Sequence, residues 1–324
     1  MQLWNSLADV PPGFGPSVVT LGNFDGMHRG HQHLIKTVAD HARARGARAV
    51  AITFEPHPVR LHRPEQGLVQ LQSLSDRLAA LAALGLDAAL VVAYTAEFSR
   101  LSPERFARDY LAGALGAQEV VVGRDLQFGS DNSGNLETIR ELGEGLGFKV
   151  TAIDDQADPE EAGAARWSST AARQSLQDGD AAQAARILGR PHRVTGEVVH
   201  GQGRGRSLGF PTANLGGQVA GLIPADGVYA GYIVRPGLPP GSPDAVLPAA
   251  ISVGVNPTFA GLDRRVEAHA LGRDDLELYG ETIAVDFIAR LRHTLPFTAT
   301  TALVTQMRDD VAAASRVLLA SHPA

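Results

Sequence analysis

The segment from Gly22 to Gln32, GNFDGMHRGHQ, constrains the fold of this chain more than any other stretch. An apolar run with strand character at 17–21 precedes it, and apolar residues with helical spacing follow at 33–39. A strand, a glycine-rich turn and a helix in that order form an anion site, because glycine lets the backbone approach the anion while the helix N-terminus directs free N–H groups at it. His28 and His31, three residues apart, share one face and can reach the same charged group. The segment therefore predicts a phosphate-binding turn.

The first half of the chain alternates between strand-like and helical patterns. Apolar runs predict strands, and apolar residues at helical spacing predict helices between them. We expect strands near 17–21, 47–54, 87–94, 119–123 and 148–153, and helices at 33–44, 75–84, 102–115 and 136–146. This alternation is typical of a parallel sheet covered on both faces, which binds ligands beyond the carboxyl ends of its strands. The turns at 22–31, 55–58 and 123–129 follow strands, so we expect them at that edge.

The second half has a different pattern. From His192 to about Thr298 the helical periods disappear, and glycine and proline separate strand-like runs at 193–199, 227–234, 247–253, 265–271 and 282–291. This pattern predicts an antiparallel barrel or sandwich, closed by an amphipathic helix at 302–319. The change of pattern near 186–191 predicts an α/β domain over 1–187 and a β domain over 188–324.

Composition limits the kinds of partner that the chain can take. The 324 residues carry a net charge of −6, which argues against binding nucleic acid through bulk electrostatics. The chain has no cysteine, which excludes disulfides and thiolate chemistry and fits an intracellular protein. We see no signal peptide and no run near the roughly 18 apolar residues of a membrane span. We therefore expect a cytoplasmic protein without a membrane partner.

A segment rich in hydroxyl residues at 168–173, SSTAAR, follows a charged stretch at 154–166 that we interpret as a mobile loop. Hydroxyl residues at a helix start commonly cap the helix, and this is the simplest interpretation of the segment. The alternative is a second phosphate-binding clamp in which the hydroxyls act together with Arg173.

Three stretches of the second half exceed what a structural barrel needs. The glycine- and arginine-rich segment 201–209 is suited to wrapping phosphates. Thr212 and Asn214 lie on one face of an extended segment and offer hard oxygen ligands for Mg²⁺ shared with a nucleotide. Glu267 and His269 share one strand face, where a carboxylate can act as general base. Taken singly, each stretch can also be an ordinary turn, a capping motif or a solvated strand face.

In this order, the segments resemble the bifunctional bacterial riboflavin kinase/FMN adenylyltransferases, also called FAD synthetases. The resemblance covers nearly the whole chain and is carried by GNFDGMHRGHQ, TFEPHP, VVGRDLQFG, SSTAAR, GFPTANL, DGVYAG, ISVGVNPTF, VEAHAL and LYGETIAVDFIARLR. GFPTAN followed by a V-E-x-H strand is highly specific to flavokinases, whereas the paired histidines alone indicate only a nucleotidylyltransferase. The resemblance implies a Rossmann-like nucleotidylyltransferase domain with a parallel sheet, followed by an antiparallel β-barrel kinase domain with a C-terminal helix.

For the first domain, the resemblance implies transfer of AMP from ATP to FMN, which yields FAD and pyrophosphate without a covalent enzyme intermediate. His28 and His31 are then expected to bind the phosphates and the negative charge that develops. The implied ATP-binding set is Gly22, Asn23, Phe24, Asp25, His28, Gly30, His31, Ser168, Ser169, Thr170 and Arg173. His57, Asp125 and Phe128 are expected near the nucleotide or the flavin.

For the second domain, the resemblance implies phosphorylation of riboflavin by ATP. Glu267 is expected to accept the proton of the terminal ribityl hydroxyl, while Thr212 and Asn214 hold Mg²⁺ with ATP. The implied ATP-binding set is Gly201, Gly203, Arg206, Gly209, Pro211, Thr212 and Asn214. The ligands are thus Mg²⁺, ATP, riboflavin and FMN, with FAD as product, and weak self-association is left open.

Three positions depart from the family pattern. Leu126 stands where an aromatic residue is usual, and Trp167 and Ala171 stand where aliphatic residues are usual. These departures concern the packing of flavin and adenine rather than the triphosphate roles.

Three alternative functions are considered beside this one. The first domain can be vestigial, but its intact histidines and clamp residues argue against that. A flavin-binding regulator has no need of Glu267 beside a Mg²⁺ pair. A nucleotidylyltransferase for another acceptor, such as a pantetheine or glycerol phosphate, leaves the barrel half unexplained.

Overall fold

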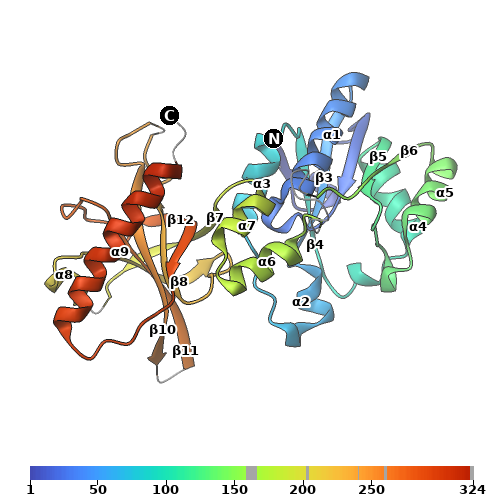
Figure 1. Ribbon diagram of the computed structural model, residues 1–324. Coiled ribbons are helices and arrows are strands. Elements are labelled where there is room, and N and C mark those ends of the chain that lie inside the picture. The colour runs from blue at the N-terminus through green and yellow to red at the C-terminus, as the bar shows by residue number, and fades with distance from the viewer. Residues whose placement is uncertain (158–165, 202–203, 240, 259–260, 322–324) are drawn as a thin grey trace. The chain divides into compact units, whose positions relative to one another are not determined.

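The computed structural model describes residues 1–157, 166–201, 204–239, 241–258 and 261–321. Backbone packing divides the chain into two compact units, Met1–Ser169 and Thr170–Ala324, each with its own hydrophobic core. The first unit is an α/β fold and the second is a β-barrel with helices, which confirms the predicted fold class (Figure 1).

The first unit is built on a six-stranded parallel sheet. Its strands are β1 (Gln2–Trp4), β2 (Ser17–Leu21), β3 (Arg48–Glu55), β4 (Ala88–Ala93), β5 (Ala117–Gly123) and β6 (Lys149–Ile153). Their order is β1-β4-β3-β2-β5-β6, so the chain builds the sheet outward from β2 in one direction and from β5 in the other. Open α/β sheets bind ligands beyond the carboxyl ends of their strands at the point where the order reverses. Gly22 follows β2 at that point.

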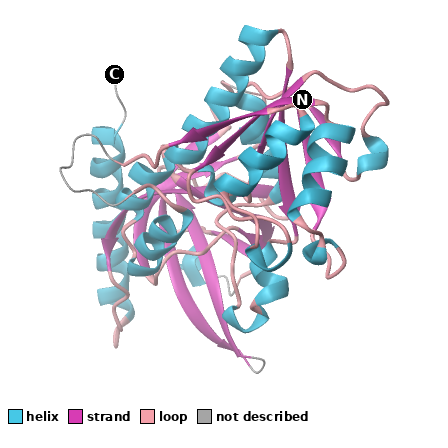
Figure 2. Ribbon diagram, turned by 90° about the vertical axis from the view of Figure 1, so that its right-hand side faces the viewer, coloured by secondary structure: helices cyan, strands magenta, loops and turns pink. Residues whose placement is uncertain are grey.

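Helices cover both faces of this sheet (Figure 2). They are α1 (Arg29–Arg45), α2 (Pro58–His62), α3 (Leu74–Ala83), α4 (Pro103–Phe106), η5 (Ala107–Ala114) and α5 (Leu136–Leu146), with 3₁₀ turns η1 (Leu7–Asp9), η2 (Asp25–Met27), η3 (Pro64–Gln66), η4 (Phe98–Arg100) and η6 (Ser130–Asn132). Side chains alternate along the strands, so Val18 packs with α1 and α3 on one face while Val19 packs with η5 and α5 on the other.

The helix expected over 102–115 has two parts. α4 starts where predicted, with Ser102 as cap, but residues Ala107–Ala114 form a π-helix. The Leu115 N–H donates to the Tyr110 carbonyl five residues earlier, at 3.1 Å. At Gly113 a Cβ atom would lie 2.9 Å from the carbonyl oxygen of Arg108, so glycine is what allows this wide turn.

The second unit is a closed antiparallel barrel. Its strands are β7 (His192–Val199), β8 (Ala213–Ala220), β9 (Gly227–Val234), β10 (Val246–Thr258), β11 (Gly261–Ala270) and β12 (Thr282–Arg292), in the order β10-β11-β8-β7-β12-β9. Apolar side chains of all six strands fill its interior, with Tyr229 and Phe287 the largest of them. The sequence pattern predicted a barrel or a sandwich, and the structure shows a closed barrel.

Among the residues that the structure describes, the helices that accompany the barrel are α6 (Ser169–Asp178), α7 (Ala181–Leu188), α8 (Arg204–Ser207) and α9 (Thr300–Ser321). α9 packs against the outside of the barrel through Ala314 and Leu318, which contact Ala230 of β9. Among the described residues, no helix combines the length and apolarity that crossing a membrane requires.

Candidate active sites

The turn after β2 brings His28 and His31 together. α1 begins at Arg29, and the Nδ1 atom of His28 caps it by accepting the N–H of His31 at 3.3 Å. The two imidazole rings stack with centroids 3.6 Å apart. A Cβ atom at Gly30 would lie 3.2 Å from the His28 ring, so glycine at this position leaves space for the imidazole. The structure therefore joins the predicted histidine pair, and it adds a capping role for His28 that the sequence did not reveal.

Both histidines of the pair are neutral at physiological pH. Burial, assisted by the positive charge of Arg166, lowers the pKa of His28 to about 4. Burial and the neighbouring His28 lower the pKa of His31 well below its usual value of 6.5. Among the described residues, no group bonds to the buried Nδ1 atom of His31. A bound phosphate supplies both a partner and a charge that favours protonation of one ring.

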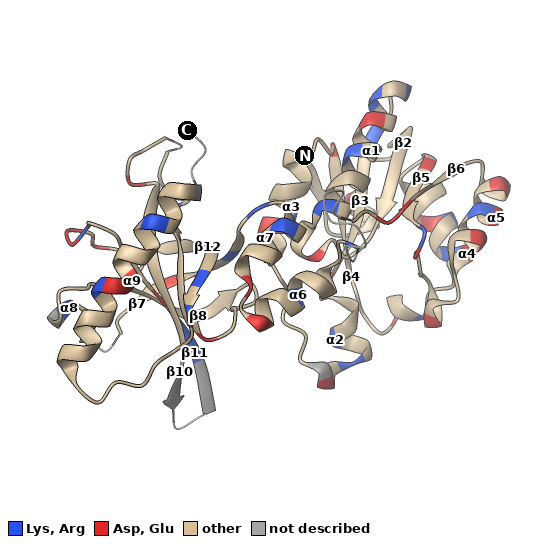
Figure 3. Ribbon diagram, viewed as in Figure 1, with Lys and Arg blue, Asp and Glu red and all other residues tan. Residues whose placement is uncertain are grey.

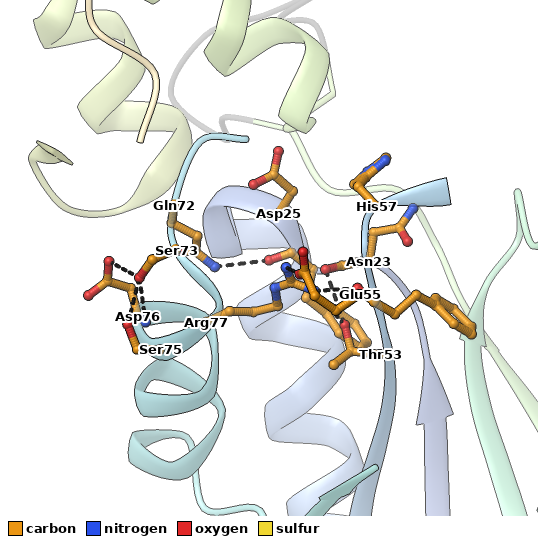
Figure 4. Close-up of polar contacts among 12 residues, drawn as sticks. Asn23, Asp25, Thr53, Glu55, His57, Gln72, Ser73, Ser75, Asp76 and Arg77 are labelled. Carbon is orange, nitrogen blue, oxygen red and sulfur yellow. Dashed lines mark hydrogen bonds and ion pairs between the residues drawn. The ribbon is translucent and has the colours of Figure 1, made fainter. Parts of the chain in front are cut away.

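The turn itself is held by the segment that leads into α3. The side chain of Asp25 is buried and accepts the N–H of Leu71 at 2.9 Å. The side chain of Gln72, labelled in Figure 4, donates to the Phe24 carbonyl at 3.1 Å. Phe24 has a φ of 51°, a conformation that needs such external support. The hydroxyl of Ser169 donates to the Asp25 carbonyl at 2.8 Å. Asp25 and Phe24 therefore shape the turn rather than face outward from it.

Arg77 of α3 braces the neighbouring strand β3 and is fully buried (Figure 4). Its guanidinium donates to the Thr53 hydroxyl at 3.0 Å, and that hydroxyl donates to the Asn23 carbonyl at 3.3 Å. It also pairs with Glu55 at 2.9 Å. The sequence did not single out Arg77, because a charged residue inside a predicted apolar helix face is recognised only from its partners on another element.

An aromatic pocket of about 180 Å³ lies beside the turn, at the carboxyl edge of the sheet. Leu21, Gly22 and Asn23 form one side of it. Its aromatic lining comes from Phe54, Tyr94, Phe98, Phe106 and Phe128, and Leu126 also lines it. Only Phe128 of these aromatics was predicted at a site. Phe54 and Tyr94 end or directly follow predicted strands, which is the signal that could have identified them.

The other residues predicted for the first site lie in varied surroundings. His57 is buried, and its Nδ1 atom accepts the Val59 N–H at 3.2 Å at the start of α2. Asp125 is exposed and pairs with Arg166 at 3.0 Å. Trp167, one of the departures, has the Arg29 guanidinium 5.5 Å from its ring centroid, a cation–π contact.

The predicted clamp spans the division between the two units. Ser168 and Ser169 end the first unit, and the Ser169 hydroxyl bonds to the Asp25 carbonyl of the turn. Thr170, Ala171 and Arg173 follow on α6 in the second unit. The stretch expected as a mobile loop is described at 154–157 and 166, and 158–165 lie outside the described residues.

In the barrel, the predicted kinase residues converge from two paired strands. Asn214 of β8 lies opposite Glu267 of β11 in the strand register. The amide nitrogen of Asn214 donates to the Thr212 hydroxyl at 3.3 Å and to its carbonyl at 3.2 Å. At Gly201 a Cβ atom would lie 2.6 Å from the Asn214 Oδ1 atom, so glycine leaves room for this amide.

Two pockets of the barrel unit share Thr212. The smaller, of about 60 Å³, is lined by Gly201, Arg206, Pro211, Thr212, Asn214, Arg273 and Tyr279, among others. The larger, of about 320 Å³, is lined by Thr212 and Glu267 together with apolar side chains of the barrel and of α9. The Thr212–Glu267 region thus forms the border between a small pocket of mixed polar and apolar lining and a larger, more apolar one.

Glu267 is suited to proton transfer at this border. It is half-buried, while Val266 and Ala268 on the opposite strand face are buried, as the alternation predicts. Burial raises the pKa of Glu267 above its usual value, and Arg265 partly opposes the shift. His269 on the same face bonds through Nδ1 to the Pro211 carbonyl at 2.8 Å and so fixes the segment that carries Thr212.

The remaining predicted residues of the second site belong to the glycine-rich segment. Gly203 lies outside the described residues. Arg206 is exposed, 3.7 Å from Glu277, and Gly209 has a φ of 87° that favours glycine. The sequence missed the stack between His200 and Tyr279, whose ring centroids are 3.9 Å apart beside the smaller pocket.

Comparison with known families defines the class of protein. The FAD synthetase family model matches residues 12–171, and the riboflavin kinase family model matches residues 188–318. The chain is thus a two-domain transferase of flavin metabolism, with the FAD synthetase domain first and the riboflavin kinase domain second.

Curated relatives and a solved structure extend the match to nearly the whole chain. The bifunctional riboflavin kinase/FMN adenylyltransferase of Escherichia coli strain K12 is 35% identical over 91% of this chain and 91% of its own length. The protein of that name from Listeria monocytogenes is 35% identical over 90% of each. A crystal structure described as a macrolide-efflux protein from Streptococcus pneumoniae has a TM-score of 0.84 and 30% identity, covering 95% of this chain and 96% of that one. The chain belongs to the family of bifunctional riboflavin kinase/FMN adenylyltransferases.

Proposed function

We propose that the barrel unit transfers the γ-phosphate of ATP to riboflavin across Thr212. The observation that carries this proposal is that Thr212 lines both pockets. The smaller pocket, with Arg206 and Arg273, suits the polyphosphate of a nucleotide. The larger pocket suits the flavin ring, because most of its lining is apolar.

Glu267 acts as the general base of this transfer. Its carboxylate accepts the proton of the terminal ribityl hydroxyl while that oxygen attacks the γ-phosphorus and ADP leaves. A pKa raised by burial makes the carboxylate a better proton acceptor than an exposed glutamate.

The Thr212–Asn214 pair is suited to Mg²⁺. Both residues offer neutral oxygen atoms, and the bonds of Asn214 to Thr212 use its amide nitrogen rather than its Oδ1 atom. Mg²⁺ is typically held by one or two protein oxygens together with substrate phosphates, and two donors therefore suffice. When bound, the ion offsets the negative charge of the phosphates during transfer.

We propose that the first domain adenylylates FMN. The phosphate of FMN attacks the α-phosphorus of ATP, and pyrophosphate leaves, with no covalent intermediate on the protein. His28 and His31 hold the triphosphate, assisted by Gly22, Asn23 and the clamp of Ser168, Ser169, Thr170 and Arg173. The aromatic pocket beside the turn holds the flavin ring, which stacks well on aromatic side chains. We assign His57 and Asp125 to the surroundings of the nucleotide or the flavin.

We further propose that the functional division falls at 187/188, because α6 carries three of the four clamp residues although nearly all of it belongs to the barrel unit. The partners are small molecules in the cytoplasm, and neither nucleic acid nor a membrane is involved. Figure 3 shows both acidic and basic residues on the described elements of each unit, and the net charge of −6 supports this. Weak self-association is tested by sedimentation velocity at rising protein concentration.

One experiment tests both activities. The purified protein is incubated with riboflavin, ATP and Mg²⁺, and the flavins are separated over time; FMN and then FAD are expected. Glu267→Ala is expected to abolish FMN formation while FMN added to the assay is still converted to FAD. His31→Ala is expected to stop FAD formation and let FMN accumulate. Loss of both activities in either variant, with the fold intact, contradicts this division of labour.

A further inference from the structure

Arg292 and Asp310 form a bidentate ion pair between the end of β12 and the middle of α9. The Nε atom of Arg292 donates to Oδ1 of Asp310 at 2.8 Å, and Nη2 donates to Oδ2 at 2.6 Å. Gln306, one turn earlier on α9, donates to the same Oδ1 atom at 3.0 Å. Asp310 is only 7% exposed, and charged hydrogen bonds are strongest when water is excluded.

The residues between the two partners, 293–309, form a strap along the larger pocket. None of these residues is buried, and Asp310 is the first buried position on α9, followed at helical spacing by Ala314 and Leu318. The strap contributes the pocket-lining side chains Thr294, Leu295, Phe297, Leu303 and Met307.

The buried apolar residues of α9 that pack on the barrel, Ala314 and Leu318, lie beyond Asp310, whereas Leu303 and Met307 before it are partly exposed. The ion pair adds a charged attachment at Asp310, and because its partners flank the strap, it closes the strap into a loop. We propose that the Arg292–Asp310 pair is a latch that fixes the strap against the barrel and thereby sets the affinity for riboflavin. Arg292 and Asp310 also line the larger pocket themselves, so the digestion described below separates an effect through the strap from direct contact with the ligand. The inference rests on the proposed kinase function.

The kinetic test breaks the latch and compares it with a second pair on the same strand. Asp286 of β12 pairs bidentately with Arg193 at 2.6 and 2.7 Å, and neither residue lines a pocket described here. In Asp310→Asn we expect the KM for riboflavin to rise about tenfold, because only a fraction of molecules then holds the strap in place. The KM for ATP and the rate of FMN adenylylation stay within about twofold. In Asp286→Asn the KM for riboflavin is unchanged. An unchanged KM in Asp310→Asn, or an equal rise in both variants, overturns the proposal.

A second measurement needs no kinase activity. Arg308 is exposed on the strap, and limited trypsin digestion without ligands is followed by mass spectrometry. We expect faster cleavage after Arg308 in Asp310→Asn than in wild type or Asp286→Asn, and protection by riboflavin. Equal cleavage in all three proteins overturns the latch, because the pair then acts only by touching the ligand. If the wild-type protein has no kinase activity, the proposed function is wrong, but the digestion still shows whether the Arg292–Asp310 pair holds the strap in place.

A milder variant covers the case in which Asp310→Asn does not fold. Arg292→Lys keeps the charge but loses the two parallel bonds, and it is expected to show the same selective rise in KM for riboflavin. In the double variant Arg292→Lys/Asp310→Asn we expect the KM for riboflavin to be no higher than in the more affected single variant, because both substitutions break the same ion pair. Multiplied effects in the double variant contradict a joint role.

Discussion

Replacing Gly201 by alanine places a methyl group on the Asn214 side chain. The new Cβ atom would lie 2.6, 2.7 and 2.8 Å from Oδ1, Cγ and Nδ2 of that amide. An ordinary contact is near 3.5 Å, so the amide must move by about 1 Å, and a misplacement of that size at a reacting centre costs about 100-fold in rate. The backbone at Gly201 is not in the left-handed region, and the fold should therefore tolerate alanine.

The assay measures FMN formation from riboflavin and FAD formation from FMN in separate reactions. For Gly201→Ala we expect the first rate to fall about 100-fold and the second to stay unchanged. Gly254→Ala on β10 is the matched control, because its added Cβ atom meets no atom within 4 Å. If Gly201→Ala keeps riboflavin phosphorylation within about threefold of wild type, the role given to Asn214 is refuted.

Three further predictions concern pH, the flavin pocket and the brace of the first unit. Burial lowers the pKa of His192 to about 4, so as the pH falls below 6.5 the unfolded chain binds a proton that the folded chain does not. The free energy of unfolding should therefore drop by about 2 kcal/mol between pH 7 and pH 5, measured by urea unfolding with circular dichroism. In His192→Gln this part of the drop should be absent. Tyr94→Leu removes one aromatic wall and should raise the KM for FMN in adenylylation by about tenfold with the KM for ATP unchanged; equal changes in both constants contradict the flavin assignment. Arg77→Met leaves Glu55 without its buried partner and should lower the free energy of unfolding of the first unit by about 3–5 kcal/mol. Urea unfolding is followed by tryptophan fluorescence, because both tryptophans, Trp4 and Trp167, belong to that unit. An unchanged urea midpoint contradicts the bracing role of Arg77.

Features that depend on local chemistry were predictable from the sequence. Gly46 ends α1 in the left-handed conformation that a C-terminal glycine favours, and the helix at 136–146 has the predicted bounds. The alternation of Glu267 and His269 with buried neighbours also follows from the period of a strand. In each case the residues that decide the structure are neighbours in the chain.

Features that depend on partners from elsewhere were not predictable. The strand β1 has only three residues and forms by pairing with β4, and β8 carries Gly216 and Gly217, which weaken any strand pattern. The predicted helix 75–84 exists, but one of its two fully buried positions is Arg77, whose burial depends on Thr53 and Glu55 of the strand β3. The aromatic pocket likewise gathers side chains from four separate stretches.

The stacked histidines carry a consequence for proton balance. Two imidazolium rings with centroids 3.6 Å apart repel each other, so the pair accepts at most one proton. With both rings neutral when empty, the turn has little attraction for the small anions that surround it in a cell. If the triphosphate binds here as proposed, its negative charge favours protonation of one ring, the proton comes from the buffer, and the heat of ATP binding then depends on the ionisation enthalpy of the buffer. The first domain would thus take up acid as it loads its nucleotide.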